Sequence, residues 1–180
     1  MEESWYVEIG ALGYIPPDLH GDRLEVWLLG LGAVYGCTVL APATPGGQRI
    51  LLQADFPALF DRYDLPNDDP RGQVMGGIRV AAAHALKHVC QWNESHWSEI
   101  DHGTAGLLEL DATWMEDVVC DEVNDYHNCL EALDSPFAHP ENSLILASFG
   151  GSVWQHYMSE RYGLDLVRSY WRRRGLYAHD

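Results

Sequence analysis

Residues 78–91 read IRVAAAHALKHVCQ and predict a helix that runs through the core, around which the rest of the chain packs. Its apolar residues recur every three or four positions, which is the spacing of one helix face. Three consecutive alanines, residues 81–83, keep one turn of that helix narrow, as a tightly packed interior requires. The predicted apolar positions include Ile78, Ala82, Leu86 and Val89.

Two histidines lie on this helix four residues apart. Because that spacing is about one helical turn, the imidazoles of His84 and His88 project from one face and can bind one zinc ion. The same pair occurs in the HExxH motif, where the glutamate after the first histidine is the general base for a zinc-bound water. Here the segment is HALKH, so Ala85 occupies the position of the base. The pair alone is a weak sign, since many helices carry two histidines that bind no metal.

The residues before the helix predict a small β-sheet. Segments 23–28 (RLEVWL), 33–40 (AVYGCTVL) and 49–54 (RILLQA) are β-rich and are separated by glycine and proline turns. We expect this sheet to be antiparallel at least in part. Residues 61–73 are polar and contain prolines, which indicates a loop inside one domain spanning residues 1–180, β-rich over 1–60 and helical over 74–180.

The chain after the active-site helix reads as mostly helical. A polar loop over 93–103 is followed by predicted helices over 104–119 and 122–133. A longer helix is expected from Ser143 to Tyr162, weakened at Gly150 and Gly151, and a last short helix from Asp165. The predicted fold is therefore α+β and compact, with a small N-terminal sheet over the helix that carries the two histidines and a helical C-terminal half.

Composition narrows the classes of partner. Hydrophobic residues make up 47% and charged residues 21% of the chain, which is typical of a globular domain. The net charge of -16 disfavours nucleic acid as a partner, because phosphates would be repelled. The same charge permits a basic peptide or protein as substrate, or serves only solubility.

The expected localisation rests on two kinds of segment that are not seen in the given sequence, a membrane span and a signal peptide. No apolar run reaches membrane-spanning length, and the acidic start MEE lacks the basic region of a signal peptide. We expect a cytoplasmic protein without a membrane partner, or a secreted one if an N-terminal segment has been trimmed. The four cysteines form no CxxC pair, which argues against a cysteine zinc knuckle. The oligomeric state is not readable.

A zinc site needs a third protein ligand, and the next predicted helix offers Glu109, Asp111 and Glu116. The run AAAHALKHVCQW, a polar loop and then LLELDATWMEDVVCDEVNDYHNCL resembles the MXAN_6640 family of metallopeptidases. That family's pattern is similar to AHExxHxxQ, then WxEGxAxWMED, then an acidic NDY segment. The segments VYG, ILLQADF and WQHYMSERYG also resemble the family, so the resemblance covers most of residues 23–174.

The resemblance implies a gluzincin-like site that holds Zn²⁺ on His84, His88 and Glu109 and hydrolyses a peptide bond of a peptide or protein substrate. Glu116 follows Glu109 by seven residues, about two turns, so it faces roughly the same way. It would orient a histidine, and it is the alternative third ligand. Asp111 points to another face and is expected to be structural.

The sequence departs from the family pattern at several positions. Leu110 and Asp111 replace small residues, and Phe149 stands where a tyrosine is common and so lacks a hydroxyl to support the reaction. Tyr157 and His156, further along the same predicted helix, are candidate oxyanion donors, although packing roles are more common for such residues.

Alanine at position 85 has two explanations. Either the base was replaced deliberately, which leaves the ligands intact, or this is a natural pseudo-peptidase that binds zinc or peptide without cleaving. The complete ligand set favours the first explanation. Loss of a general base lowers the rate on the order of 10² to 10⁴, so little activity is expected from this chain. The rival functions are a non-enzymatic binding module and a zinc hydrolase for a non-peptide amide. An edge strand within residues 33–40 is expected to pair with an extended peptide.

Overall fold

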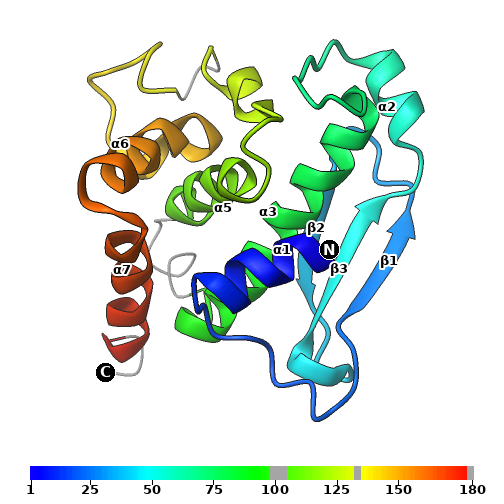
Figure 1. The fold of residues 1–180 in the computed structure, drawn as a ribbon, viewed down its shortest axis with the longest axis vertical. Coiled ribbons are helices and arrows are strands. Elements are labelled where there is room, and N and C mark those ends of the chain that lie inside the picture. The colour runs from blue at the N-terminus through cyan, green and yellow to red at the C-terminus, as the bar shows by residue number, and fades with distance from the viewer. Residues whose placement is uncertain (98–104, 132–134, 178–180) are drawn as a thin grey trace.

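The computed structural model describes residues 1–97, 105–131 and 135–177, without the side chains of Ile145 and residues 174–177. The fold is α+β, with a three-stranded sheet in the N-terminal third and helices in the C-terminal half, as predicted. Figure 1 shows the long helix α3 (Gln73–Ser95) between the sheet on one side and the later helices on the other.

The sheet has the strand order β1-β3-β2, so the last strand in sequence lies in the middle. Strand β1 (Glu25–Leu29) runs parallel to β3 (Gln48–Gln53), and β2 (Gly36–Leu40) runs antiparallel to it. The three predicted strands and the partly antiparallel pairing are therefore confirmed. Among the described residues β2 pairs only with β3, so β2 is an edge strand and no other strand of this sheet covers its second edge.

Three helical elements lie in or overlap the region that was predicted to contain only strands and turns. The chain begins with α1 (Glu2–Trp5) and a π-helical turn (Tyr6–Ala11), and α2 (Phe56–Arg62) follows β3. Helix α2 has a readable signal: the Asp55 carboxylate accepts a hydrogen bond from the Ala58 N–H at 3.0 Å, and Pro57 stands at the start of the helix.

Helix α3 is buried on both sides because two apolar clusters meet along it. Small residues allow this close packing: a Cβ added to Gly77 would lie 2.7 Å from the Phe60 ring of α2. The cluster on the sheet side contains Ile50, Leu52, Phe56, Leu59, Ala81, Ala85, Leu86 and Val89. The cluster on the other side contains Tyr14, Val80, Ala83, Cys90, Leu108, Trp114, Met115, Val119, Cys120, Val123, Val167 and Trp171.

After α3, the described residues form the α-helices α5 (Gly106–Val119), α6 (Ser152–Tyr162) and α7 (Leu164–Tyr177). The predicted helix over 122–133 is wrong for its described residues, which form only a 3-10 turn at Asp125–Cys129; residues 132–134 are not described. The predicted helix from Ser143 begins at Ser152, after 3-10 turns at Leu144–Leu146 and Ser148–Gly151.

Close packing explains why the chain bends before α6. A Cβ on Gly150 would lie 2.8 Å from the Cα of Ser135 and 3.0 Å from the carbonyl oxygen of Cys129, so glycine permits these segments to touch. The predicted end of α6 at Gly163 is confirmed, because Gly163 has φ 89°. Helix α7 runs to Tyr177 and is longer than predicted.

The four cysteines, all in described residues, form no disulfide. None of the described helices is both long and apolar enough to cross a membrane.

Candidate metal centre

Helices α3 and α5 bring the three predicted ligands together. The Nε2 atoms of His84 and His88 lie 3.0 Å apart. The carboxylate of Glu109, at the start of α5, lies 3.2 Å from Nε2 of His84 and 3.6 Å from Nε2 of His88. Residues 98–104, which connect the two helices, are not described. From the sequence alone, the crossing of the two helices was only an expectation.

The donor set fits a zinc ion. One atom from each of the three side chains can be chosen so that all lie within 4.8 Å of one another. Ligands of a tetrahedral zinc ion lie at about 2.0–2.2 Å from it and thus roughly 3.3 Å from one another. The two Nε2 atoms are 3.0 Å apart, Oε2 of Glu109 lies 3.2 Å from that of His84, and its other oxygen, Oε1, lies 3.6 Å from that of His88, so each pair is near this value. Two imidazoles and one carboxylate are also a usual donor set for a catalytic zinc, which keeps a fourth position open.

Glu116 holds the far side of His84. Its Oε1 lies 2.6 Å from Nδ1 of His84, so the ring presents Nε2 to the other two candidate ligands. Position 116 is two turns after Glu109 on α5, which is why both carboxylates reach the same ring. Glu109 therefore lies at the candidate ligand position, and Glu116 lies where it can orient the His84 ring. Carboxylates that bind the second nitrogen of a ligating histidine are a common support of zinc sites.

Gln91 orients the ring of His88, as Glu116 orients that of His84. Its Oε1 lies 2.8 Å from Nδ1 of His88, and its Nε2 donates to the Leu108 carbonyl at 3.0 Å and to Oδ2 of Asp111 at 3.0 Å. Two acceptors at the amide nitrogen fix which end of Gln91 faces His88. Since Oε1 can only accept, Nδ1 of His88 carries the hydrogen and Nε2 keeps its lone pair for a metal.

A buried ion pair lies behind this amide. Nζ of Lys87 lies 3.0 Å from Oδ2 of Asp111, with side-chain exposures of 0% and 1%. The ammonium also lies 3.4 Å from the centre of the Tyr14 ring. Burial alone would lower the pKa of Lys87, but Asp111 and Tyr14 hold it above its ordinary value, so the lysine stays charged. Asp111, expected to be structural, therefore anchors Gln91 and through it His88.

Replacing Lys87 by methionine is expected to lower the free energy of unfolding by about 3–5 kcal/mol, because Asp111 would remain buried without its cation. Urea unfolding of the metal-free protein measures this. The double variant Lys87→Met with Asp111→Asn removes the stranded charge and should recover part of the loss. A loss below about 1 kcal/mol in the single variant would show that the pair is not needed.

Charge at the metal-free site is concentrated on one imidazole. Burial would lower the pKa of His84, but hydrogen bonds and charges from Glu109 and Glu116 raise it to about 10. Burial would raise the pKa of Glu109, but His84 and His88 hold it well below its ordinary value. In the metal-free protein, His84 is thus an imidazolium at neutral pH, and a proton takes the place of the cation between these side chains.

Replacing Glu116 by glutamine is expected to weaken zinc binding by about 10- to 100-fold, because a neutral amide supports the His84 ring less well than a carboxylate does. Competition with a fluorescent zinc chelator measures this change. Asp117→Asn is the matched control, since it removes the neighbouring carboxylate, which does not line the cleft described next. Equal affinities for both variants would contradict the orienting role.

The candidate ligands open into a cleft of about 540 Å³ between the edge of the sheet, α3 and α5. Residues just before and within β2 form one wall, and Ala81, His84 and His88 of α3 form another. The two walls are joined by a hydrogen bond of 2.7 Å from Oγ1 of Thr38 to the carbonyl oxygen of Ala85. The open edge of β2 therefore runs beside the candidate metal centre.

Ala85 lies at the border of this cleft, under the sheet. It is 1% exposed and packs in the sheet-side cluster. On a helix surface, position 85 neighbours positions 81 and 88, and both of these line the cleft. A longer side chain at position 85 would therefore start next to the candidate metal centre, whereas alanine stays beneath it.

The other predicted catalytic positions fall in different places. Phe149 lines the cleft and stacks on His84 with ring centroids 5.8 Å apart, so the position where the family pattern has tyrosine is at the site. Tyr157 is 53% exposed and packs on Trp154. His156 packs on Tyr126 and faces Asp117 at 3.7 Å. Neither Tyr157 nor His156 is among the described residues that line the cleft.

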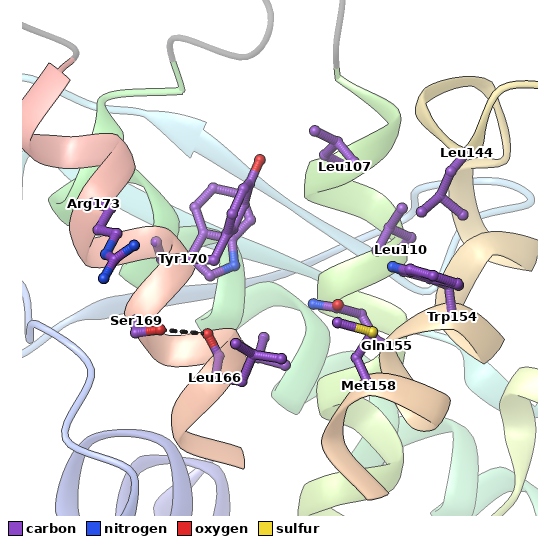
Figure 2. Close-up of a pocket in the computed structure, with 12 residues that line it drawn as sticks. Leu107, Leu110, Leu144, Trp154, Gln155, Met158, Leu166, Ser169, Tyr170 and Arg173 are labelled. Carbon is purple, nitrogen blue, oxygen red and sulfur yellow. Dashed lines mark hydrogen bonds between the residues drawn. The ribbon is translucent and has the colours of Figure 1, made fainter. Parts of the chain in front are cut away.

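A second pocket, of about 600 Å³, lies on the opposite side of α5, against α6 and α7. Figure 2 shows that its labelled side chains are mainly apolar, and none of the candidate metal ligands lines it. Gln155 of this pocket donates to Oδ1 of Asp111 at 2.7 Å, the same carboxylate that anchors Gln91. Its described lining is Leu107, Leu110, Leu144, Trp154, Gln155, Met158, Leu166, Val167, Ser169, Tyr170, Trp171 and Arg173.

Sequence reasoning missed several residues of the site. The role of Gln91 was readable, because it lies three residues after His88 and so on the same helix face. No sequence signal placed Tyr35 or Thr38 in the cleft, since their position depends on how β2 packs against α3.

Comparison of this chain with models of protein families, with curated proteins and with solved structures finds no match.

Proposed function

We propose that this protein binds one zinc ion through His84, His88 and Glu109 and belongs by descent to the zinc metallopeptidases. The observation that carries the proposal is the meeting of these three side chains, with ligand atoms within 4.8 Å, at a cleft whose wall is an edge strand. The resemblance to the MXAN_6640 family points the same way, because it selects the same three residues. An α+β fold with a helix under a small sheet suits a zincin.

The proposed parent activity is hydrolysis of a peptide bond. When bound, zinc would polarise the scissile carbonyl and lower the pKa of a water. His84 and His88 would be held in the required tautomers by Glu116 and Gln91. Ala85 cannot accept a proton. This chain is therefore expected to hydrolyse peptides more slowly than a chain with a base at position 85, by a factor on the order of 10² to 10⁴.

The open edge of β2 supports a peptide as the molecule in the cleft. An extended peptide beside β2 would gain main-chain hydrogen bonds as an added strand, and its carbonyl groups would run past the candidate metal centre. Glycine at position 36 keeps this strand close to its neighbour, because a Cβ there would lie 2.8 Å from the Leu51 carbonyl oxygen.

A zinc-binding pseudo-peptidase that holds peptides without cleaving them is the second candidate. Ala85 favours it, since the methyl group is buried among Ile50, Leu52 and Leu86 with 1% exposure, as in a settled apolar core. In this case zinc and peptide bind, and no base at position 85 is needed.

Metal analysis of the purified protein tests the proposal. After incubation with zinc and removal of the excess, one zinc per chain is expected. His88→Ala should lose it, and His139→Ala should keep it, since His139 does not line the cleft. Less than half a zinc per chain, or equal zinc in both variants, would overturn the metal site.

A further inference from the structure

We propose that the cleft selects peptides that present a cationic group, and that Asp125 is the residue that receives it. This inference rests on the proposed function, because it names the chemistry of the peptide that the same cleft binds. It concerns recognition and not hydrolysis, so it applies to this chain with alanine at position 85.

Carboxylates outnumber cationic side chains in the cleft, where the His84 imidazolium is already faced by two glutamates. The described lining includes the carboxylates of Glu109, Glu116 and Asp125, and no lysine or arginine. The two glutamates face His84 and His88 and are engaged at the candidate metal centre. Asp125 is the third carboxylate, and its side chain is not part of that cluster.

Asp125 has neutral partners only among the contacts of the described residues. Its Oδ1 accepts from the Tyr35 hydroxyl at 3.3 Å and from Nδ2 of Asn67 at 3.5 Å, and both distances are long. Burial and the charge of Glu116 raise its pKa to about 7, against the two hydrogen bonds, which lower it. A half-buried carboxylate with a raised pKa and no cation is stabilised when a ligand supplies one.

A second polar group in the cleft is also unused. Thr113 lines the cleft from α5, between Glu109 and Glu116, and is 1% exposed. Its Oγ1 has no hydrogen-bond partner among the described residues. Buried hydroxyl groups are almost always paired, so this oxygen points to a polar ligand in the cleft. An ammonium or guanidinium group brings donors for both Asp125 and this oxygen. A carboxylate could accept from the hydroxyl but would be repelled by Asp125, and an apolar side chain would pair with neither.

The peptide backbone and the cationic group would use different parts of the cleft. The edge of β2 offers main-chain hydrogen bonds to any extended peptide, which gives no preference for one side chain. Asp125 comes from the 3-10 turn Asp125–Cys129 and contacts Tyr35, just before β2, so its carboxylate adds a preference for charge beside the strand edge.

The test uses zinc-loaded protein and capped alanine pentapeptides with a variable central residue. Isothermal titration compares central lysine, arginine, norleucine and glutamate, and an uncapped alanine pentapeptide with a free N-terminal amine. We expect the lysine or arginine peptide to bind at least about tenfold more tightly than the norleucine peptide, and the glutamate peptide most weakly. If the uncapped peptide, and not the lysine or arginine peptide, binds about tenfold more tightly than the norleucine peptide, then Asp125 receives the N-terminal ammonium.

Asp125→Asn should remove the preference while keeping an acceptor for Tyr35. Asp121→Asn is the matched control, because it removes one exposed aspartate outside the lining of the cleft. Equal binding of the lysine, norleucine and glutamate peptides by the unaltered protein, or no binding of any, would overturn the inference without need of a variant. Zinc measured on the same samples separates the two proposals: one zinc per chain without charge preference leaves the metal site standing and removes the role of Asp125.

Discussion

Replacing Ala85 by glutamate is expected to turn the zinc-loaded protein into a peptidase, with a gain in rate on the order of 10² to 10⁴. Position 85 lies on α3 beside positions 81 and 88, which line the cleft, so a glutamate side chain can extend from the helix towards the candidate metal centre. There its carboxylate would take a proton from water during attack on the scissile carbonyl. Cleavage of a fluorogenic peptide library, with products identified by mass spectrometry, measures the gain.

Ala85→Gln is the matched control, because glutamine has almost the same size and cannot act as the base. It should fold like the glutamate variant and stay inactive. A combined Ala85→Glu and Phe149→Tyr variant would also place a phenol over His84, where Phe149 now stacks, and is expected to be faster again. If Ala85→Glu binds zinc, stays folded and cleaves neither the library nor itself, the peptidase parentage loses its support and the binding module becomes the better proposal.

Zinc affinity is expected to rise about tenfold for each pH unit, and so about 100-fold between pH 6 and pH 8. In the metal-free protein the pKa of His84 is about 10, because Glu109 and Glu116 outweigh the effect of burial. Throughout that pH range zinc must therefore displace one proton from Nε2 of His84. Zinc titration at several pH values, with a chelator of known pH dependence as competitor, gives the slope.

The Glu116→Gln variant provides the internal check, since loss of one carboxylate lowers the pKa of His84 and should flatten the slope. The stability of the metal-free protein gives a second check, because it should fall with rising pH whereas zinc affinity should rise. A histidine with a raised pKa contributes its full stabilisation below its ordinary pKa of about 6.5, and the contribution is lost as the pH rises through about 10. An affinity independent of pH between 6 and 8 would show that His84 is already neutral in the metal-free protein.

Local sequence patterns predicted the elements that depend on local chemistry. The three strands have β-branched and apolar runs between glycine and proline turns, and α3 and α5 have apolar residues at helical spacing. The predicted helices over 122–133 and from Ser143 were wrong where contact with other segments decides the backbone. Gly150, for example, packs against Ser135 and Cys129, and this close approach holds a 3-10 turn there.

The arrangement of the histidine pair could be predicted without a structure. Spacing along one helix fixes that His84 and His88 share a face, because the helical repeat does not depend on the rest of the chain. That Ala85 stands where the HExxH motif has its glutamate is likewise a matter of sequence alone. The choice of Glu109 came from the resemblance, since residue spacing left Glu116 open as a ligand.

Only the tertiary structure decided which nitrogen each carboxylate faces, because this depends on how α5 crosses α3. It placed Glu116 at Nδ1 of His84 and Glu109 at Nε2. It also buried Lys87 against Asp111 behind Gln91, and brought Asp125 into the cleft from a turn 37 residues after His88 in the sequence. These contacts join residues far apart in the chain, so their energies depend on packing and burial, which no local pattern records.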